Sequence, residues 1–505
     1  MPLYLSFVVS CLLCGWIFEN STLRAMLATV FAIVVVGYWA FQSPFAMYEG
    51  SLKLVNVASI VQSGHVVLSL GNYLGYPAYF ITGAALSIFS GMGLSFQLAF
   101  VIFNLGLMSL SFYVLTHHFL KNSLLAFLAS VLVTEGNVYL ATYQFHPDLL
   151  SVNLVLLSII VLETESRRSI IPSILLFFLI IMSDFTASSV VFSFLVIRYV
   201  FSKRYLLRSS LRLVIGSYIL VFLAWNIFWG EGSIPSILSD VISNLGNLLT
   251  GVNHVRSTFS SNVTGPPWST LVNVTWITML DILPLVILFA SSILKGRKSI
   301  GGTIPSFFLA SVAVGIATII GQAGVNYFVV LLYAPFAGTL ILLGNQRLLG
   351  RKLLLVGILI TTLCVPTFLA FNYRVVTASI PSQDAFAGYY FAMHSSTTAV
   401  VYTDNFAIQW YNPAILIAAP PETATGAGNA NLNSSDLVAA FSNGYLASFE
   451  SHSGAFFEFY PTMLDNYYHQ YGSNTGNNLR KDTLNQLHEG NLLYTNGYDL
   501  LFNRI

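Results

Sequence analysis

Charged side chains are scarce in this sequence. Only 8% of its 505 residues are Asp, Glu, Lys or Arg, whereas 55% are hydrophobic, and the mean hydropathy is +0.73. Soluble domains contain about 25% charged residues. So few charges exclude a chain that is soluble throughout and indicate a polytopic membrane protein. The net charge is +1 and there is no basic tract, so nothing here indicates a nucleic-acid partner.

Cysteine is also scarce. The three cysteines are Cys11 and Cys14, in the first apolar run, and Cys364, in the last. None of them lies in a polar part of the chain, so no disulfide framework is predicted. The Cys11-x-x-Cys14 spacing resembles a redox or metal pair, but cysteines within an apolar helix are more often small packing residues.

The motifs of soluble enzymes are missing as well. The sequence contains no GxxxxGK[ST], no HExxH and no GxSxG, and its cysteines and histidines show no metal-ligand spacing. Each of these motifs serves a particular chemistry, such as holding a phosphate or a zinc ion. Their absence argues against an ATP-driven pump that carries its motor in the same chain.

Long apolar runs dominate what is present. A helix needs about 20 apolar residues to cross a bilayer, and about 11–13 spans are predicted, from the runs at 3–18, 24–42, 97–116, 123–141, 148–163, 169–183, 185–201, 210–229, 268–294, 302–321, 326–345 and 352–371. The run 3–18 lacks the basic start of a signal peptide, so we interpret it as a short span. A further run, 76–92, is short and rich in glycine and alanine.

The distribution of lysine and arginine predicts the orientation. If 76–92 does not cross, most of these residues fall in short inner loops, as the positive-inside rule requires. If it did cross, Arg167, Arg168 and the basic cluster 203–212 would move outside. We therefore expect 76–92 to be a re-entrant or surface-lying helix. The protein as a whole is predicted to lie in the cell membrane.

This topology divides the chain into two predicted domains. Residues 1–371 form the transmembrane domain, with a first outer loop at 43–95 and a second at 230–267. Residues 372–505 are polar and contain no spanning run; short apolar runs and turn signals predict a small mixed α/β domain outside the cell. The hairpin expected there joins 491–494 to 498–502 around Thr495-Asn496-Gly497.

Ionisable residues near the membrane are candidates for function because burying them is costly. Acids and histidines from distant parts of the sequence converge on the outer side in this topology: Glu49, His65, His146, Asp148 and Asp184. Each has a structural alternative. Asp184 could cap a helix, Asp148 follows Pro147 as in a helical first turn, and His65 could follow the end of a surface helix at Gly64.

The same layout resembles the GT-C superfamily of membrane glycosyltransferases, which includes protein mannosyltransferases, aminoarabinose transferases and oligosaccharyltransferases. The resemblance lies in Glu49 on the first outer loop, then Ala58-Ser59-Ile60 with Gly64-His65, then Tyr76-Pro77, and then the stretch from Tyr143 to Asp148 that reads YQFHPD. It covers roughly residues 24–371 as architecture, with loose motifs, and is similar in kind to archaeal multi-pass members.

The resemblance implies a reaction and a set of roles. A sugar would pass from a polyprenyl-phosphate donor to an acceptor, such as a protein, on the outer face. Glu49 matches the acid that serves as general base or metal ligand. Tyr48, His65, Tyr76, His146, Asp148 and Asp184 are the expected substrate-binding residues. A divalent cation would stabilise the phosphate; its ligands are not assigned.

Two other functions fit the sequence. The chain could be a non-enzymatic assembly or anchoring subunit of the same architecture, whose outer tail binds a partner. It could also be a secondary transporter, but such proteins typically show internal repeats and polar groups at the midplane. Here no clear repeat is seen and the acids fall at one face.

Overall fold

The computed structural model describes part of the chain, most of it helical. The described residues are 2–42, 57, 60–61, 64–66, 76–91, 96–137, 147–163, 170–201, 205–228, 282–295, 302–320, 333–343, 401–403, 429–431, 456–459, 491–495 and 500–503. Of the predicted site residues, Tyr48, Glu49 and His146 lie outside these ranges. So does the predicted span 352–371.

The chain divides into two compact units. The first contains Met1–Trp39, Gly71–Tyr79 and Ala99–Asn372, and the second contains Ala40–Leu70, Phe80–Leu98 and Tyr373–Ile505. The second unit thus takes in parts of the predicted first outer loop as well as the tail. The predicted division at 371/372 and the two outer loops stay predictions.

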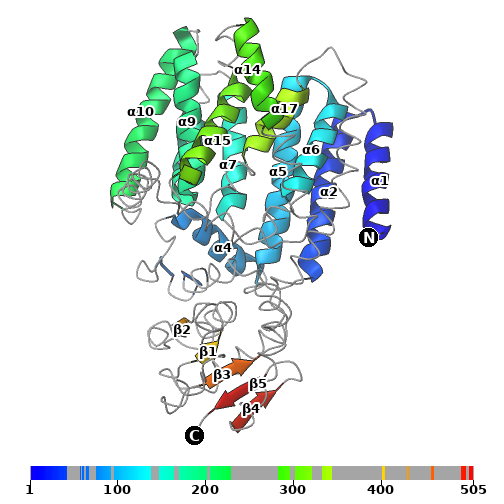
Figure 1. Cartoon of the computed structure of the whole chain (residues 1–505), viewed down its shortest axis with the longest axis vertical. Helices are drawn as coiled ribbons and strands as arrows, with labels where there is room; N and C mark the ends of the chain where they lie inside the picture. Colours follow the sequence, from blue (N-terminus) through cyan, green and yellow to red (C-terminus); the bar gives the residue numbers. More distant parts are fainter. Residues whose placement is uncertain are drawn as a thin grey trace, which may run out of the picture. The chain divides into compact units, whose positions relative to one another are not determined.

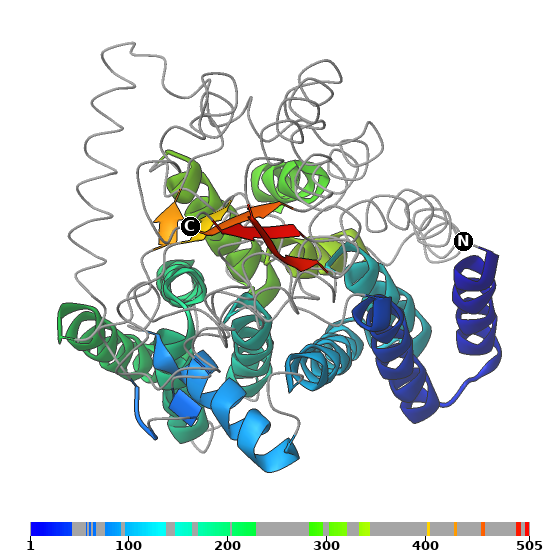
Figure 2. The ribbon, with the colours of Figure 1, turned by 90° about the horizontal axis from the view of Figure 1, so that it is seen from below.

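Most of the described helices belong to the first unit, whereas the helical residues Phe80–Ser90 belong to the second (Figures 1 and 2). The structure contains α1 (Pro2–Ile17), α2 (Ser21–Gln42), α4 (Pro77–Ser90), α5 (Phe96–Leu120), α6 (Ser123–Asn137), α7 (Pro147–Glu163), α8 (Ile170–Ser183), α9 (Phe185–Phe201), α10 (Tyr205–Phe228), α14 (Leu283–Lys295), α15 (Thr303–Ile320) and α17 (Ala334–Leu343). Most of the predicted spans therefore coincide with helices, and the short run 76–92 forms α4. Whether α4 crosses the membrane stays a prediction.

Side-chain caps begin several of these helices. The Oδ1 atom of Asn20 accepts a hydrogen bond from the Thr22 amide at 2.8 Å, at the start of α2. Asn122 does the same for the Leu125 amide of α6 at 3.0 Å. Such caps satisfy amides that have no partner within the helix, so they fix the points where the chain turns back.

Buried aromatic side chains join the helices of the first unit. Phe194 of α9 meets Phe307 of α15 edge to face, and Phe112 of α5 meets Phe336 of α17 in the same way. Helix α9 packs against α7, α8, α10 and α15, and α17 packs against α6, α14 and α15. Helices α7, α8 and α9 therefore belong to one packed group, which matters for the site below.

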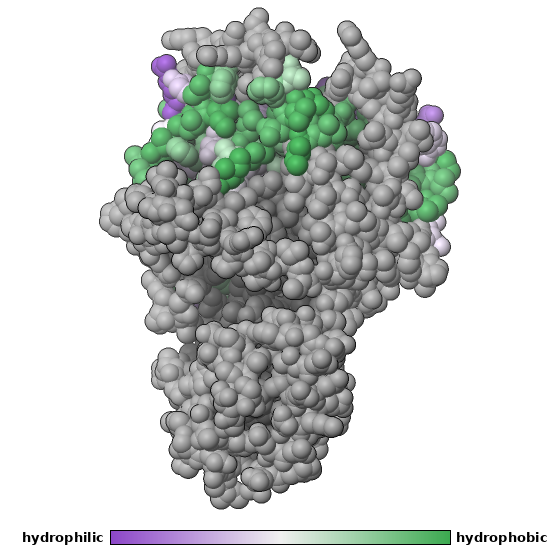
Figure 3. All heavy atoms as spheres, in the orientation of Figure 1, coloured by the Kyte–Doolittle hydropathy of each residue, from purple (hydrophilic) through white to green (hydrophobic). Residues whose placement is uncertain are grey.

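Many large apolar side chains point outward from the helices. Examples are Leu13 and Trp16 on α1 and Leu220 on α10, all of them well exposed, and Figure 3 shows such surfaces in green. Within the described residues, Ala99–Leu120, with a mean hydropathy of 1.8, is the one helix long and apolar enough to cross a membrane; the other apolar helices are shorter. The number of spans stays a prediction.

The described part of the second unit includes a five-stranded sheet. Its strands are β1 (Val401–Thr403), β2 (Asn429–Asn431), β3 (Phe456–Phe459), β4 (Asn491–Thr495) and β5 (Leu500–Asn503), in the order β2-β1-β3-β5-β4. Strand β1 pairs in parallel with β2 and β3, whereas β5 pairs antiparallel with β3 and β4. The predicted hairpin is therefore confirmed as β4–β5. The helical part of the predicted α/β domain lies outside the described residues.

Candidate functional site

Asp184 occupies the single residue between α8 and α9. Its Oδ1 accepts a hydrogen bond from the Thr186 amide at 2.8 Å, and its Oδ2 accepts one from the Ala187 amide at 3.3 Å. Both amides belong to the first turn of α9, so Asp184 is the N-cap of that helix. The capping alternative raised from the sequence Ser183-Asp184-Phe185-Thr186 is confirmed.

Asp184 also has a second role in the structure, because its carboxyl group shares a hydrogen bond with that of Asp148. Asp148 lies in the first turn of α7, directly after Pro147. Burial, reinforced by the negative charge of Asp148 and by this hydrogen bond, raises the pKa of Asp184 to about 8, although the two capping amides act in the opposite direction. Two carboxyl groups so close cannot both be ionised at low energetic cost, so the pair retains a proton at neutral pH.

Two tyrosines, Tyr79 and Tyr333, lie near the carboxyl pair. Tyr333, which is 1% exposed and precedes α17, lies within electrostatic range of both aspartates and beside Ser151 of α7. Ser151 donates its hydroxyl proton to the Pro147 carbonyl at 2.7 Å. Tyr79 lies within electrostatic range of Asp148 and packs edge to face on Phe100. Two buried tyrosines therefore lie within electrostatic range of the carboxyl pair.

Tyr76, predicted to bind substrate, contacts α10. Its hydroxyl donates to Oδ1 of Asn226 at 3.2 Å, and Nδ2 of Asn226 donates in turn to the Phe222 carbonyl at 2.8 Å. This bond ties the segment just before α4 to the bundle. A structural role for the Tyr76 hydroxyl is therefore visible, and its substrate role stays a prediction.

His65 belongs to the second unit, where it is exposed. It follows Gly64, whose φ is 73° and whose amide donates to the Ile60 carbonyl at 2.9 Å. A glycine in this left-handed conformation is the usual way to end a helix. The structural alternative for His65, a position just after the end of a helix, agrees with this geometry.

Reasoning from the sequence missed Tyr333, Ser151 and Asn226 as residues near the site. A tyrosine or a serine within an apolar run is read as packing, because such residues are common in membrane helices. Tyr333 lies far from Asp148 and Asp184 in the sequence. Only the fold brings it close to these two aspartates. The one local signal was that Ser151 and Asn226 stand close to the ends of the predicted runs 148–163 and 210–229.

The arrangement has a defined chemical capacity. A protonated carboxyl beside an ionised one can both donate and accept hydrogen bonds, which suits a ligand rich in hydroxyl groups. Within the described residues, no three His, Cys, Asp or Glu side chains lie together as a metal site would require.

Sequence comparison gives no relatives, because no protein-family model and no curated protein matches the chain. Solved structures do resemble it. The oligosaccharyltransferase AglB from Archaeoglobus fulgidus, in complex with an inhibitory peptide and a dolichol-phosphate, has a TM-score of 0.53 at 13% identity, over 88% of this chain and 70% of that one. Its apo form also gives 0.53, at 11% identity over 90% and 72%.

A second similar structure comes from a bacterium. ArnT from Cupriavidus metallidurans in the apo state has a TM-score of 0.52 at 11% identity, and the match covers 96% of this chain and 98% of that one. AglB and ArnT are both GT-C glycosyltransferases. At such low identity the likeness concerns the fold, and the resemblance seen in the sequence is confirmed at that level: the chain has a GT-C-like fold.

Proposed function

We propose that this protein is a membrane glycosyltransferase that moves a sugar from a polyprenyl-phosphate carrier to an acceptor on the outer face of the cell membrane. The observation that carries the proposal is the hydrogen-bonded pair of Asp148 and Asp184 within a GT-C-like fold. Paired carboxyl groups from separate helices are costly to bury in a bundle, and binding of a polar ligand is a reason to retain them.

The nature of the donor and acceptor is supported by similar structures. The Archaeoglobus oligosaccharyltransferase is solved with a dolichol-phosphate, and in another form it is tethered to an acceptor peptide containing the NVT sequon. We infer that the present chain also uses a lipid-linked sugar and takes a peptide or another polar acceptor. A form of the same enzyme with zinc and sulfate is known, which supports a divalent cation as a further component here.

The proposed reaction assigns one step to Glu49. Its carboxylate accepts the proton of an acceptor hydroxyl or amide, and the acceptor atom forms a new bond to the anomeric carbon of the sugar. The bond from that carbon to the phosphate oxygen breaks, and the lipid phosphate leaves with the electron pair. We assign binding and orientation of the substrates to Asp148, Asp184, Tyr48, His65, Tyr76 and His146.

The test is sugar transfer from polyprenyl-phosphate sugars extracted from membranes. We expect Glu49→Gln to abolish transfer, and Asp148→Asn and Asp184→Asn to weaken it at least tenfold. Glu19→Gln is the matched control, because Glu19 is an exposed carboxylate in the short loop between α1 and α2. Full activity in folded Glu49→Gln would end the role of Glu49. A wild-type protein that transfers no sugar from any extracted donor would favour the assembly-subunit alternative.

A further inference from the structure

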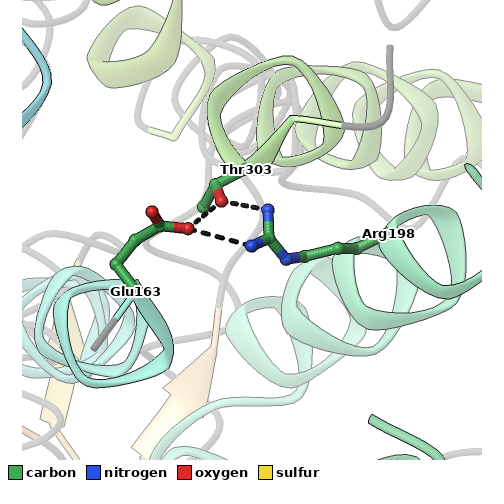
Figure 4. Close-up of polar contacts among 3 residues, drawn as sticks. All are labelled: Glu163, Arg198 and Thr303. Atoms are coloured by element: carbon green, nitrogen blue, oxygen red, sulfur yellow. Dashed lines mark hydrogen bonds and ion pairs between the residues drawn. The ribbon is translucent and has the colours of Figure 1, made fainter. Parts of the chain in front are cut away.

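A buried three-residue contact lies at the ends of α7 and α9 that are remote from the two aspartates (Figure 4). Nη2 of Arg198 lies 3.0 Å from Oε1 of Glu163, and these side chains are only 6% and 15% exposed. Nη1 of Arg198 donates to the hydroxyl of Thr303, which itself donates to Oε1 of Glu163. The planar fork of a guanidinium can hold two acceptors at once, so one arginine joins three helices.

The contact connects the same two helices that carry the carboxyl pair. Helix α7 begins at Pro147, next to Asp148, and ends at Glu163; helix α9 begins directly after Asp184 and carries Arg198 in its last turn. With a rise of about 1.5 Å per residue, each helix spans about 25 Å. The two helices pack against one another and are linked at both ends, by the carboxyl pair at their starts and by Glu163 and Arg198 at their ends.

Helix electrostatics do not explain Glu163. An acid at the C-terminus of a helix is opposed by the helix dipole, whereas an arginine there is favoured. Glu163 is the last residue of α7, and Arg198 lies in the last turn of α9. Glu163 is thus unfavourable for its own helix, and its favourable contacts are made to α9 and to Thr303, at the start of α15.

We infer that Glu163, Arg198 and Thr303 form a positioning clamp, which fixes α7 against α9 and so holds Asp148 against Asp184 at the opposite ends of these helices. A helix is stiff along its axis, so sliding or rotation of α7 at one end is carried to the other. A carboxyl–carboxyl hydrogen bond is good only between about 2.5 and 3.0 Å, so a small shift would break it. The clamp itself is argued from contacts alone. Only the role of the aspartate pair as a substrate site rests on the proposed function.

Titration of Asp184 reports the clamp without any sugar transfer. The protonated Asp184 carboxyl has an infrared C=O stretch, which Asp184→Asn identifies by removing it. Among the described residues, the titratable groups that interact with Asp184 are Asp148 and Tyr333, and neither belongs to the clamp. The midpoint is the pH at which half of this band is lost. If the two carboxyl groups moved apart, the charge of Asp148 would raise the pKa of Asp184 less, so the midpoint would fall.

We expect Glu163→Gln to lower this midpoint by about one pH unit, a typical effect of a neighbouring charge. Thr303→Val should lower it less, and Thr303→Ser, which keeps the hydroxyl, should restore the wild-type value. Asp148→Asn removes the charge of Asp148 and therefore gives the midpoint expected if its charge no longer acted on Asp184 at all. Ser123→Ala is the matched control, because Ser123 also accepts a hydrogen bond from a buried arginine, Arg24, at 2.6 Å but lies on α6, which packs mainly against α1 and α17.

A folded Glu163→Gln protein with an unchanged midpoint would overturn the inference, and the contact would then contribute to stability alone. If Glu163→Gln does not fold, an unchanged midpoint in Thr303→Val would have the same consequence. An equal shift in Ser123→Ala would also overturn it, because any loosening of the bundle would then suffice. A shifted midpoint in a protein that transfers no sugar would leave the clamp standing and count against the proposed function.

Discussion

The carboxyl groups of Asp148 and Asp184 share a hydrogen bond although the whole of α8 separates them in the sequence. Helices α7 and α9 each start at this point, with Asp148 in the first turn of one and Asp184 capping the other. Both carboxyl groups therefore lie where helix N-termini favour negative charge. This setting allows one carboxyl to stay ionised while the other keeps its proton.

Replacing Asp184 by asparagine should remove a pH dependence of stability. The pKa of Asp184 is raised from 3.8 to about 8, so between these values the folded protein holds a proton that the unfolded chain releases. The free energy of unfolding therefore falls as pH rises through this window, by an amount on the order of a few kcal/mol. Asparagine caps helices as well as aspartate does, so α9 should keep its start.

Thermal unfolding in detergent between pH 4 and 9 checks this. The difference in stability between Asp184→Asn and wild type should grow in favour of the variant as pH rises, and level off above about pH 8. A difference that stays flat across the range would contradict the raised pKa.

Replacing Asp148 by asparagine should lower the pKa of Asp184 without returning it to its ordinary value. The charge of Asp148 is one cause of the shift, but burial is the larger one. We expect a fall of about one to two pH units, read from the pH dependence of unfolding or from the carboxyl infrared band. If the midpoint stayed near 8, burial alone would account for the shift and the pairing would carry no charge coupling.

The sequence predicted part of this site. The N-cap role of Asp184 and the first-turn position of Asp148 follow from local signals, a polar residue before an apolar run and a proline at a helix start. Counting spans placed both aspartates on one side of the membrane. The distance between them could not be predicted, because it depends on how α7, α8 and α9 pack, and apolar runs of similar composition specify no particular neighbour.

The same limit explains what the sequence missed. Glu163 and Thr303 lie at the ends of apolar runs, where charged and polar residues are ordinary, and nothing in the sequence distinguishes Arg198 from the other basic residues near the ends of the runs. Their contact became visible once three helix ends were brought together. Helix existence, in contrast, was predicted well, because 20-residue apolar runs and their caps are local properties.

Tyr76→Phe should destabilise the protein by about 1–3 kcal/mol, because it leaves Oδ1 of Asn226 buried without its donor. Asn226 is fully buried, and its Nδ2 is already used by the Phe222 carbonyl. Tyr199→Phe is the matched control, since the Tyr199 hydroxyl accepts a hydrogen bond from Arg212 in an exposed setting, and its loss should change stability by less than about 0.5 kcal/mol. If the two changes lowered stability equally in thermal unfolding, the Tyr76–Asn226 hydrogen bond would contribute no more to stability than an exposed one.

Gly15→Ala should loosen the contact of α1 with α6. A Cβ atom at Gly15 would overlap the ring of Phe127, which is fully buried, while the Gly15 carbonyl accepts a hydrogen bond from Nε of Arg24 at 2.9 Å. Overpacking of this kind costs about 1–3 kcal/mol. Shortening the ring side chain in the double variant Gly15→Ala/Phe127→Leu should recover part of the loss, and a double-mutant cycle measures the coupling.

Gly216 of α10 provides the control for Gly15. It is also a helical glycine, but a Cβ there would meet nothing within 4 Å. Gly216→Ala should therefore raise stability by up to about 1 kcal/mol, the usual gain of alanine over glycine in a helix. The change in stability on replacing glycine by alanine is therefore expected to have opposite signs at the two positions. This distinguishes the effect of packing from that of helix propensity. If Gly15→Ala were stabilising too, then α1 would not pack against α6 in the folded protein.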